Sequence, residues 1–367
     1  MDCQDKPLSP SWLKSRHIPT LKGKDCEVCL KKDAGLRCSA CQCVHYCSRE
    51  HQASDRPNHE TSCAVIKKFR LRYEHHEEVL SRDMDHGLVT PGNRDNLFQT
   101  GAGHFWGILE TRPYMSARFR LVDATLERFR ARRHVLQAAL GHLLDMLRLC
   151  RGDNMGVRDI VPSLYLSLGR EQEAYDFIKW YATTGNDANY DWGNMDLPYL
   201  DVKNADVTVP WPTNKKWLNL THSSTVILVK MRILHDLQAA QNATIALQGV
   251  VPQEIIGLIR NHLVSTNVQL RPELLMASPD AASRVIETLK GQLKDLCKAV
   301  DKYNPHFWLY MLDEPGEAAA NKPSGYSIRT PEEAQLFIGH NLCAWEETLG
   351  AFDTLNAIYE AIHFHPS

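Results

Sequence analysis

Residues 26–63 read CEVCLKKDAGLRCSACQCVHYCSREHQASDRPNHETSC, and they place eight candidate metal ligands at zinc-finger spacing. A Cys-x2-Cys step lets one short turn direct two thiolates at one metal ion, and zinc favours four sulfur or nitrogen ligands in a tetrahedron. Eight ligands therefore predict two closed sites with no open position for water or substrate, which indicates a structural metal. The candidate ligands are Cys26, Cys29, Cys38, Cys41, Cys47, His51, His59 and Cys63.

The order of these ligands resembles the MYND zinc finger, in which the first and third ligand pairs share one zinc ion and the second and fourth pairs share the other. The resemblance implies a small cross-braced module with two Zn²⁺ ions. One position departs from the family, whose sixth ligand is usually cysteine; His51 stands there, and zinc also accepts imidazole. Carried over residue by residue, site one is Cys26, Cys29, Cys47 and His51, and site two is Cys38, Cys41, His59 and Cys63.

The finger's composition bears on its folding and on its partners. Residues 24–63 contain almost no apolar core, so metal binding must supply folding free energy, on the order of 10 kcal/mol per structural zinc. Their basic and acidic side chains balance, and each site of three thiolates and one histidine adds one negative charge, which disfavours phosphate binding. MYND fingers dock proteins, often proline-rich peptides, and the resemblance implies such a partner. Arg56 stands where the family has a tryptophan on its apolar face.

The whole chain has the composition of a globular protein: 367 residues, 43% hydrophobic, 23% charged, with a formal net charge of −2. This charge provides no general attraction to nucleic acid or to an anionic membrane. No apolar run reaches membrane-spanning length, and the N-terminus has no apolar signal-peptide core. Clustered Cys-x2-Cys pairs without a secretion signal indicate zinc in a reducing compartment, so we expect a cytoplasmic or nuclear protein.

The remaining sequence predicts a mainly α fold, in which a helical domain follows the finger. Residues 64–80 predict a helix and 81–114 a connector. Residues 115–150 predict one long helix with a seam at 4-3-4-3 spacing, interpreted as a core face with a coiled coil as the alternative. The seam is Val122, Leu126, Phe129, Arg133, Leu136, Leu140, Leu143 and Leu147.

Residues 157–182 predict a helical hairpin whose turn, Leu-Gly-Arg-x-x-Glu-Ala at 168–174, is similar to that of tetratricopeptide-type repeats. The stretch 185–220 is rich in Asn, Asp, Pro and Trp and predicts a long loop, either packed or functional. Helices resume at 222–242, 252–264, 279–301 and from 331 to about 363. The predicted segments are an N-terminal extension (1–23), the finger (24–63), a helix and connector (64–114) and an α-helical domain (115–367).

The sequence offers two other classes of function. Seven arginines between 112 and 133 are a pattern found in nucleic-acid-binding proteins. However, they scatter around the helical wheel, which favours a solvated surface. Some SET-type lysine methyltransferases carry a MYND insert. However, strand signals are scarce and the sequence has no Asn-His-Ser-Cys-x-Pro-Asn-like cofactor motif. We assign no catalytic and no organic-cofactor-binding residue.

Together these features predict a zinc-binding adaptor or scaffold for protein–protein interaction, in which the finger docks partner proteins or peptides. The chain resembles the fungal MYND-finger proteins that lack a SET domain. The alternative is a divergent SET-type methyltransferase, or another enzyme with its site in the helical domain, where the 185–220 loop is the nearest candidate.

Overall fold

The structure is a computed structural model, and it describes residues 21–82, 97–213, 218–275 and 277–364. Most of the predicted extension 1–23 and residues 83–96 of the predicted connector lie outside these ranges. The chain divides into two compact units. We call Thr20–Arg170 with Trp180–Asp201 the finger unit, and Glu171–Lys179 with Val202–Ser367 the helical unit. The four segments predicted from the sequence remain predictions, because a division into compact units does not show which stretch of the chain folds by itself.

The finger unit joins the cysteine-rich stretch to a group of helices. Its only described sheet is the antiparallel pair β1–β2, in which Leu36 lies opposite Tyr46 and Arg37 opposite His45. Its described elements are β1 (Leu36–Arg37), β2 (His45–Tyr46), α1 (Arg49–Ser54), α2 (Arg56–Arg82), α3 (Leu97–Thr100), η3 (Phe105–Gly107), η4 (Leu109–Thr111), α4 (Arg112–Phe129), α5 (Arg133–Leu149), η5 (Val157–Asp159), α6 (Val161–Ser167) and η6 (Thr184–Asn186).

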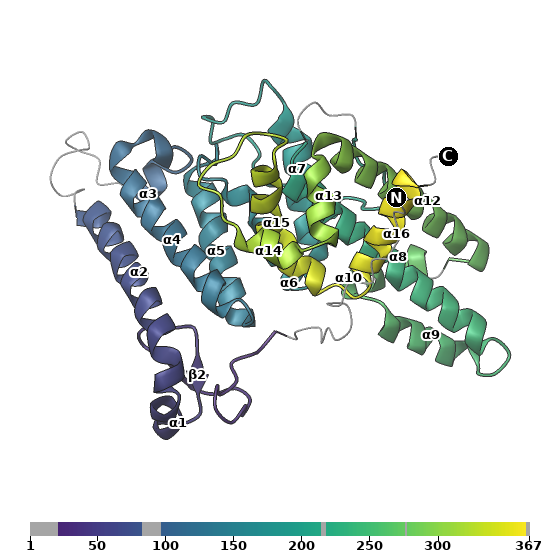
Figure 1. The fold of residues 1–367 in the computed structure, drawn as a ribbon, viewed down its shortest axis with the longest axis horizontal. Helices are drawn as coiled ribbons and strands as arrows, with labels where there is room; N and C mark the ends of the chain where they lie inside the picture. The colour runs from purple at the N-terminus through teal and green to yellow at the C-terminus, as the bar shows by residue number, and fades with distance from the viewer. Residues whose placement is uncertain (1–20, 83–96, 214–217, 276, 365–367) are drawn as a thin grey trace, which may run out of the picture. The chain divides into compact units, whose positions relative to one another are not determined.

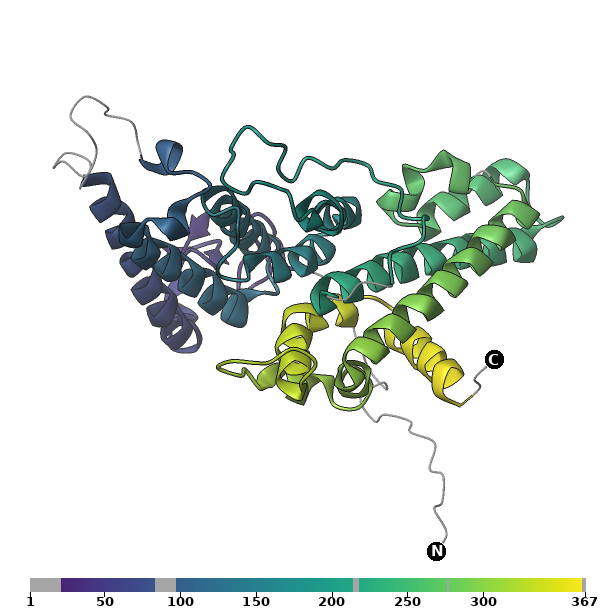
Figure 2. The same cartoon turned by 90° about the horizontal axis from the view of Figure 1, so that it is seen from above.

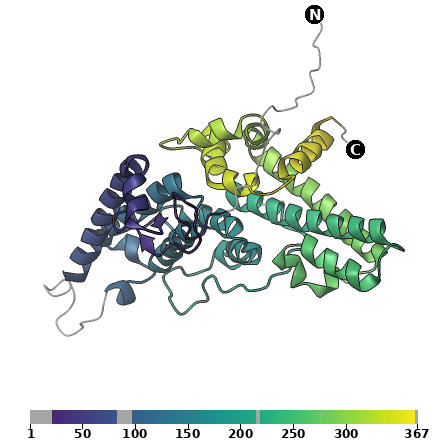
Figure 3. The same cartoon turned by 90° about the horizontal axis from the view of Figure 1, so that it is seen from below.

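Three helices form the body of this unit. α2 packs along α4, and α4 packs along α5, so the three lie next to one another (Figure 1). The short strands and loops of the finger lie at one end of α2 (Figure 3). The finger and the helices share one core, because finger residues such as Val44 and Tyr46 belong to the same buried cluster as Ile66 of α2, Leu121 of α4 and Val135 of α5.

The single helix expected over 115–150 is wrong, since α4 ends at Phe129 and α5 begins at Arg133. Arg132 has an extended backbone, with φ −115° and ψ 121°, and forms a parallel bridge with Lys22. The amide of Lys22 donates to the carbonyl of Ala131 and the amide of Arg133 donates to that of Lys22, both at 2.9 Å. The approach of this incoming chain uses backbone groups that a continuous helix would keep for itself, so the helix is interrupted.

The predicted seam is nevertheless the core face of these two helices. Val122 and Phe129 are buried, and so are the four seam leucines of α5, Leu136, Leu140, Leu143 and Leu147, while Leu126 is half-buried. Arg133, its one polar member, is exposed at the first position of α5. The periodicity therefore identified the buried face correctly, although it did not detect the interruption.

Part of the predicted long loop is packed against the finger unit. The ring of Trp180, which is 0% exposed, makes edge contacts with Tyr190, Trp192 and Tyr199 at centroid distances of 5.0–5.8 Å. The Arg151 guanidinium donates to three backbone carbonyls between Asn194 and Leu197, at 3.0–3.2 Å. This part of the predicted loop is therefore packed against Trp180 and Arg151.

The helical unit is organised around α8, whose first half is almost wholly buried. Both α9 and α12 pack against α8 (Figure 2). Residues 171–179 of α7 belong to this unit. Its described helices are α7 (Glu171–Ala182), α8 (Leu220–Leu247), α9 (Gln253–Leu263), α10 (Thr266–Gln269), α11 (Pro272–Leu275), α12 (Pro279–Tyr303), α13 (Pro305–Leu312), α14 (Pro315–Ala320), α15 (Pro331–Glu346) and α16 (Ala351–His363).

The predicted fold class, mainly α after a small finger, is confirmed by this element list. Gly350 separates α15 from α16 with φ +73°, a backbone conformation that glycine adopts without strain, whereas Gly339 lies inside α15. Among the described helices, none combines the length and the apolar composition needed to cross a membrane.

Candidate metal centre

The first group of candidate ligands comes together from three short segments of the finger. Cys26 and Cys29 flank one turn, Cys47 directly follows β2, and His51 lies in α1. The sulfur of Cys47 lies 3.1 Å from Nδ1 of His51, and the Cys26 sulfur lies 3.5 Å from the same nitrogen. The sulfurs of Cys29 and Cys47 are 3.5 Å apart. All four ligand atoms lie within 4.8 Å of one another.

The second group combines a loop with one face of α2. Cys38 and Cys41 flank the turn after β1, while His59 and Cys63 are four positions apart on α2 and so face the same side. Nε2 of His59 lies 3.4 Å from the sulfur of Cys38 and 3.5 Å from that of Cys41. The sulfurs of Cys38 and Cys63 are 3.6 Å apart, and the four ligand atoms again lie within 4.8 Å of one another.

These distances fit a tetrahedral zinc ion. With zinc–sulfur bonds of about 2.3 Å, two ligands of one tetrahedron lie about 3.8 Å apart, close to the separations in both clusters. They do not fit a disulfide, whose sulfur atoms lie about 2.0 Å apart. Every described cysteine is free. The chain order is interleaved as well: the first cluster takes its members from both sides of Cys38 and Cys41.

The pKa values of the thiols agree with clusters that hold a cation. Burial raises the pKa of Cys26, but amide hydrogen bonds from Cys29, Cys47 and Val28 outweigh it and lower that pKa to about 6. A hydrogen bond with Cys29, burial and the neighbouring Cys26 raise the pKa of Cys47 to about 11. The cluster thus accepts one negative charge readily and a second one poorly, and a divalent cation removes that repulsion.

The second cluster behaves in the same way. Burial opposes ionisation of Cys38, yet hydrogen bonds from the Cys41 amide and from His59 lower its pKa to about 6. Burial, followed by the charges and hydrogen bonds of its cysteine neighbours, raises the pKa of Cys63 to about 12. Three thiolates can therefore coexist here when a metal ion supplies the compensating positive charge.

Local hydrogen bonds position the ligand-bearing helices. Ser48 is the N-cap of α1, and its hydroxyl accepts from the amide of His51 at 3.3 Å. The hydroxyl of Tyr46, a fully buried residue, donates to Asp55 at 2.8 Å, at the corner between α1 and α2. Tyr46 directly precedes the candidate ligand Cys47, and its role here is to hold that corner.

The finger is fastened to the helices by polar contacts as well as by the shared core. The guanidinium of Arg132 donates two hydrogen bonds to the Glu27 carboxylate, at 2.9 and 2.7 Å. Burial favours the neutral acid, but Arg132 and Lys22 hold the pKa of Glu27 below its ordinary value. Nε2 of His134 donates to the carbonyl of Cys43 at 3.0 Å, and Arg70 donates to that of Ser39 at 2.8 Å.

These fastening residues were not identified from the sequence. Arg132 belongs to the arginine-rich stretch that we interpret from the sequence as a solvated surface, but its side chain is only 13% exposed, and Arg118 of the same stretch is buried, donating to Asp145 at 2.5 Å. Their partners lie far away in the sequence or on another helix, so no local pattern marks them. The one signal in the sequence is the large number of arginines in this stretch, and that number does not show which of them are buried.

A finger that holds two zinc ions between interleaved Cys/His pairs is a cross-braced zinc finger, and the two clusters correspond to its two zinc sites. Residues 26–63 match the family model of the MYND finger. The predicted resemblance is thus confirmed for this stretch, and the protein carries a MYND zinc finger, a non-catalytic module for protein interaction. Comparisons of the chain with curated proteins and with solved structures gave no match.

Proposed function

We propose that this protein is a zinc-dependent adaptor, in which the finger docks a partner protein and the helices serve as its scaffold. We assign no catalytic residue. The proposed ligands are Cys26, Cys29, Cys47 and His51 for one zinc ion, and Cys38, Cys41, His59 and Cys63 for the other.

The observation that carries this proposal is the exposed edge of the finger. Strand β1 pairs with β2 along one edge, and no other described strand pairs with it. Its Leu36 is 40% exposed, and the finger also exposes Val28 at 44% and Leu30 at 61%. An unpaired strand edge with apolar side chains is a surface to which an extended peptide can add as a further strand.

The proposed partner segment is an extended, apolar peptide. The resemblance to the MYND family implies that proline-rich peptides are among the candidate partners. Grooves that recognise a polyproline helix are lined with aromatic side chains, whereas the finger's one tyrosine, Tyr46, is fully buried. Arg56 stands at the family's tryptophan position and pairs with Glu60 at 3.7 Å. Backbone pairing at β1, with Leu36 as an anchor, therefore accounts for binding better than proline stacking does.

The test compares three full-length proteins: the unmodified chain, Leu36→Lys and Leu71→Lys. Leu71 lies on α2 and is 51% exposed, so it controls for the loss of an exposed leucine. Deleting the finger would be a poor test, because it would expose Ile66 and Leu121 of the shared core. Each protein is first shown by native mass spectrometry to hold two zinc ions, and is then used to capture partners from source cells.

The adaptor proposal expects specific partners to be lost with Leu36→Lys and kept with Leu71→Lys. Equal capture by all three proteins would place recognition away from β1 and contradict the proposal. The enzyme alternative has a separate test, since a methyltransferase should bind S-adenosylmethionine in calorimetry. We further propose a reducing compartment, cytoplasm or nucleus, because the described cysteines are free thiols suited to zinc.

A further inference from the structure

A hollow of about 500 Å³ lies between the finger and the helices of the same unit. Its floor is apolar, formed by Ile66 of α2, Leu121 and Val122 of α4, and Val135 of α5. Lys24, Arg37 and Gln42 of the finger are exposed at its rim, so it opens to solvent. Its size falls within the usual range of small-molecule sites, about 300–1,000 Å³.

The charged groups that line this hollow are all basic. They are Lys24, Arg37 and Arg70, and no aspartate or glutamate is among the lining residues. Lys24 and Arg37 have no ion-pair partner among the described residues, while Arg70 has Glu74 at 3.3 Å. Even after subtracting Glu74 and the single negative charge of the neighbouring zinc site, one net positive charge remains.

Imidazole groups add unused hydrogen-bonding capacity to the same hollow. His45 is 6% exposed, and its ring meets that of His134 edge-on at 4.6 Å. In the described chain, Nδ1 of each ring and Nη1 of Arg70 are buried without a hydrogen-bond partner. Such atoms are rare in folded proteins, because an unpaired buried polar atom is costly. Because Nε2 of His134 donates to Cys43, Nδ1 of that neutral ring is an acceptor, so among these three atoms an anion can accept from Nδ1 of His45 or from Nη1 of Arg70.

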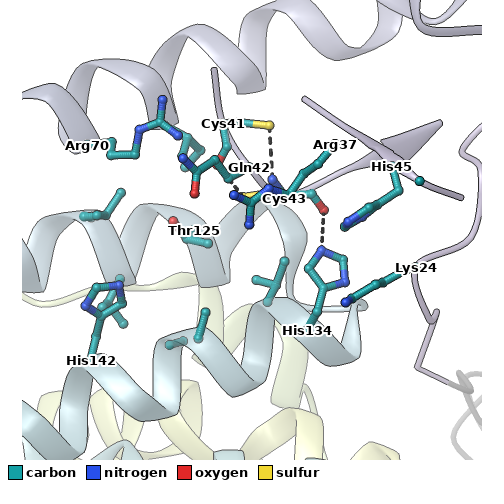
Figure 4. A pocket seen from close by; sticks show the side chains of 17 residues that line it. Lys24, Arg37, Cys41, Gln42, Cys43, His45, Arg70, Thr125, His134 and His142 are labelled. Carbon is teal, nitrogen blue, oxygen red and sulfur yellow. Dashed lines mark hydrogen bonds between the residues drawn. The ribbon is translucent and has the colours of Figure 1, made fainter. Parts of the chain in front are cut away.

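Figure 4 shows how these groups are distributed. Lys24, His45 and His134 gather towards one end of the hollow, and Arg70 and His142 lie towards the other. Burial lowers the pKa of His134, the hydrogen bond to Cys43 opposes this, and the charges of Arg132, Lys24 and Arg37 lower it further. Burial is the main cause of this shift, and the charges of Lys24 and Arg37 at the rim of the hollow add to it.

We propose that this hollow binds an organic anion with an apolar body and a single carboxylate. The apolar body covers the floor of the hollow, and the carboxylate lies beside Lys24 and Arg37. A singly charged group fits better than a phosphate dianion, because a mainly apolar lining makes a second charge costly to desolvate. A free carboxylic acid or the C-terminus of a peptide with an apolar last residue can supply this chemistry.

The first measurement is calorimetry on the full-length, zinc-loaded protein with hexanoate, hexan-1-ol and hexylammonium. These probes share one apolar body and differ in charge. We expect hexanoate to bind at least about tenfold more tightly than the alcohol, a difference of about 1.4 kcal/mol, and hexylammonium to bind most weakly. The advantage of hexanoate should fall as salt is added. Equal affinity for the three probes, or no binding of hexanoate, would overturn the proposal.

Substitutions then locate the site. Lys24→Gln and Arg37→Gln should each weaken hexanoate binding, and Lys31→Gln and Arg49→Gln, exposed finger residues outside the hollow, should not. Ala138→Trp fills the hollow from an exposed position of α5, and Gln137→Trp is its matched control. Hexanoate binding that survives Ala138→Trp, in a protein that still holds two zinc ions, would place the ligand elsewhere and contradict the proposal.

The source of the carboxylate is resolved by a second pair of probes. An acetylated Ala-Ala-Leu peptide is compared as its free acid and as its amide. Tighter binding of the acid than of either the amide or hexanoate identifies a peptide C-terminus as the ligand, and tighter binding of hexanoate identifies a free acid. Arg37 belongs both to β1 and to the hollow, so the two proposals are separated by Leu36→Lys, which changes no lining residue, and by Lys24→Gln, which changes no residue of β1.

Discussion

Arg132 and Glu27 form a two-bonded ion pair across 105 positions of sequence, and both side chains are 13% exposed. Glu27 lies inside the first Cys-x2-Cys turn, and Arg132 lies at the interruption between α4 and α5. The pair therefore connects the backbone that carries two proposed zinc ligands directly to the helices.

Removing the arginine should destabilise the protein strongly. Arg132→Met leaves the largely buried Glu27 carboxylate without its main partner, and we expect the free energy of unfolding to fall by about 3 kcal/mol. The matched control is Arg128→Met, whose partner Glu127 is half exposed, with an expected loss below about 1 kcal/mol. Urea denaturation measures the free energy of unfolding of both variants. Similar losses would show that the Arg132–Glu27 pair stabilises the protein no more than a surface ion pair does.

Two cysteines that are close in sequence should respond differently to the same substitution. Cys38→Ser should lower the zinc count in native mass spectrometry below two and unfold the finger, because metal binding supplies its folding free energy. Cys43→Ser should keep two zinc ions, since Cys43 belongs to neither cluster and its thiol donates to the carbonyl of Cys41 at 3.2 Å. Zinc loss from Cys43→Ser would mean that the proposed ligand set is wrong.

His51 is the position at which the finger departs from its family. His51→Cys restores the usual sulfur ligand, so we expect it to retain two zinc ions with thermal stability near that of the unmodified protein. His51→Ala leaves three ligands and should bind zinc at the first site far more weakly, as measured by competition with a chelator. If His51→Ala retained zinc as tightly as the unmodified protein, His51 would not be a ligand.

Lys230 should make the stability of the helical unit depend on pH in the alkaline range. The residue is fully buried, and its ammonium donates to the carbonyls of Val207 and Val209 and to the side chain of Gln292, at 2.6–2.9 Å. Burial lowers its pKa from 10.5 to about 8, with the charge of Asp206 opposing the shift. Between these values the unfolded chain holds a proton that the folded protein has released, so stability rises with pH.

The comparison of Lys230→Met with the unmodified protein isolates this effect. The free energy of unfolding of the unmodified protein should rise relative to that of the variant as the pH goes from 8 to 10.5, and the difference should be constant below pH 8. Lys290→Met is the control, because Lys290 is 47% exposed and pairs with Glu287 at the surface. A difference that does not change with pH would show that Lys230 keeps an ordinary pKa.

The elements that the sequence predicted well are those with local causes. Thr330 caps α15 and Pro331 begins it, at the start that the sequence predicted for this helix. The seam from Val122 to Leu147 is the buried face of two helices because a helical period of 3.6 residues determines which side chains share a face. The interruption at Arg132 was missed because its cause, the approach of Lys22, lies more than a hundred residues away in the chain.

The sequence by itself determined the metal chemistry of this protein. Thiolate and imidazole groups at fixed spacings reach the same point within short turns, so their identity and order are enough to predict two zinc sites. Only the tertiary structure decided that Glu27 pairs with Arg132, and that Lys24, Arg37 and Arg70 line one hollow. Contacts of this kind join segments far apart in the chain and depend on how helices pack, which no local spacing specifies.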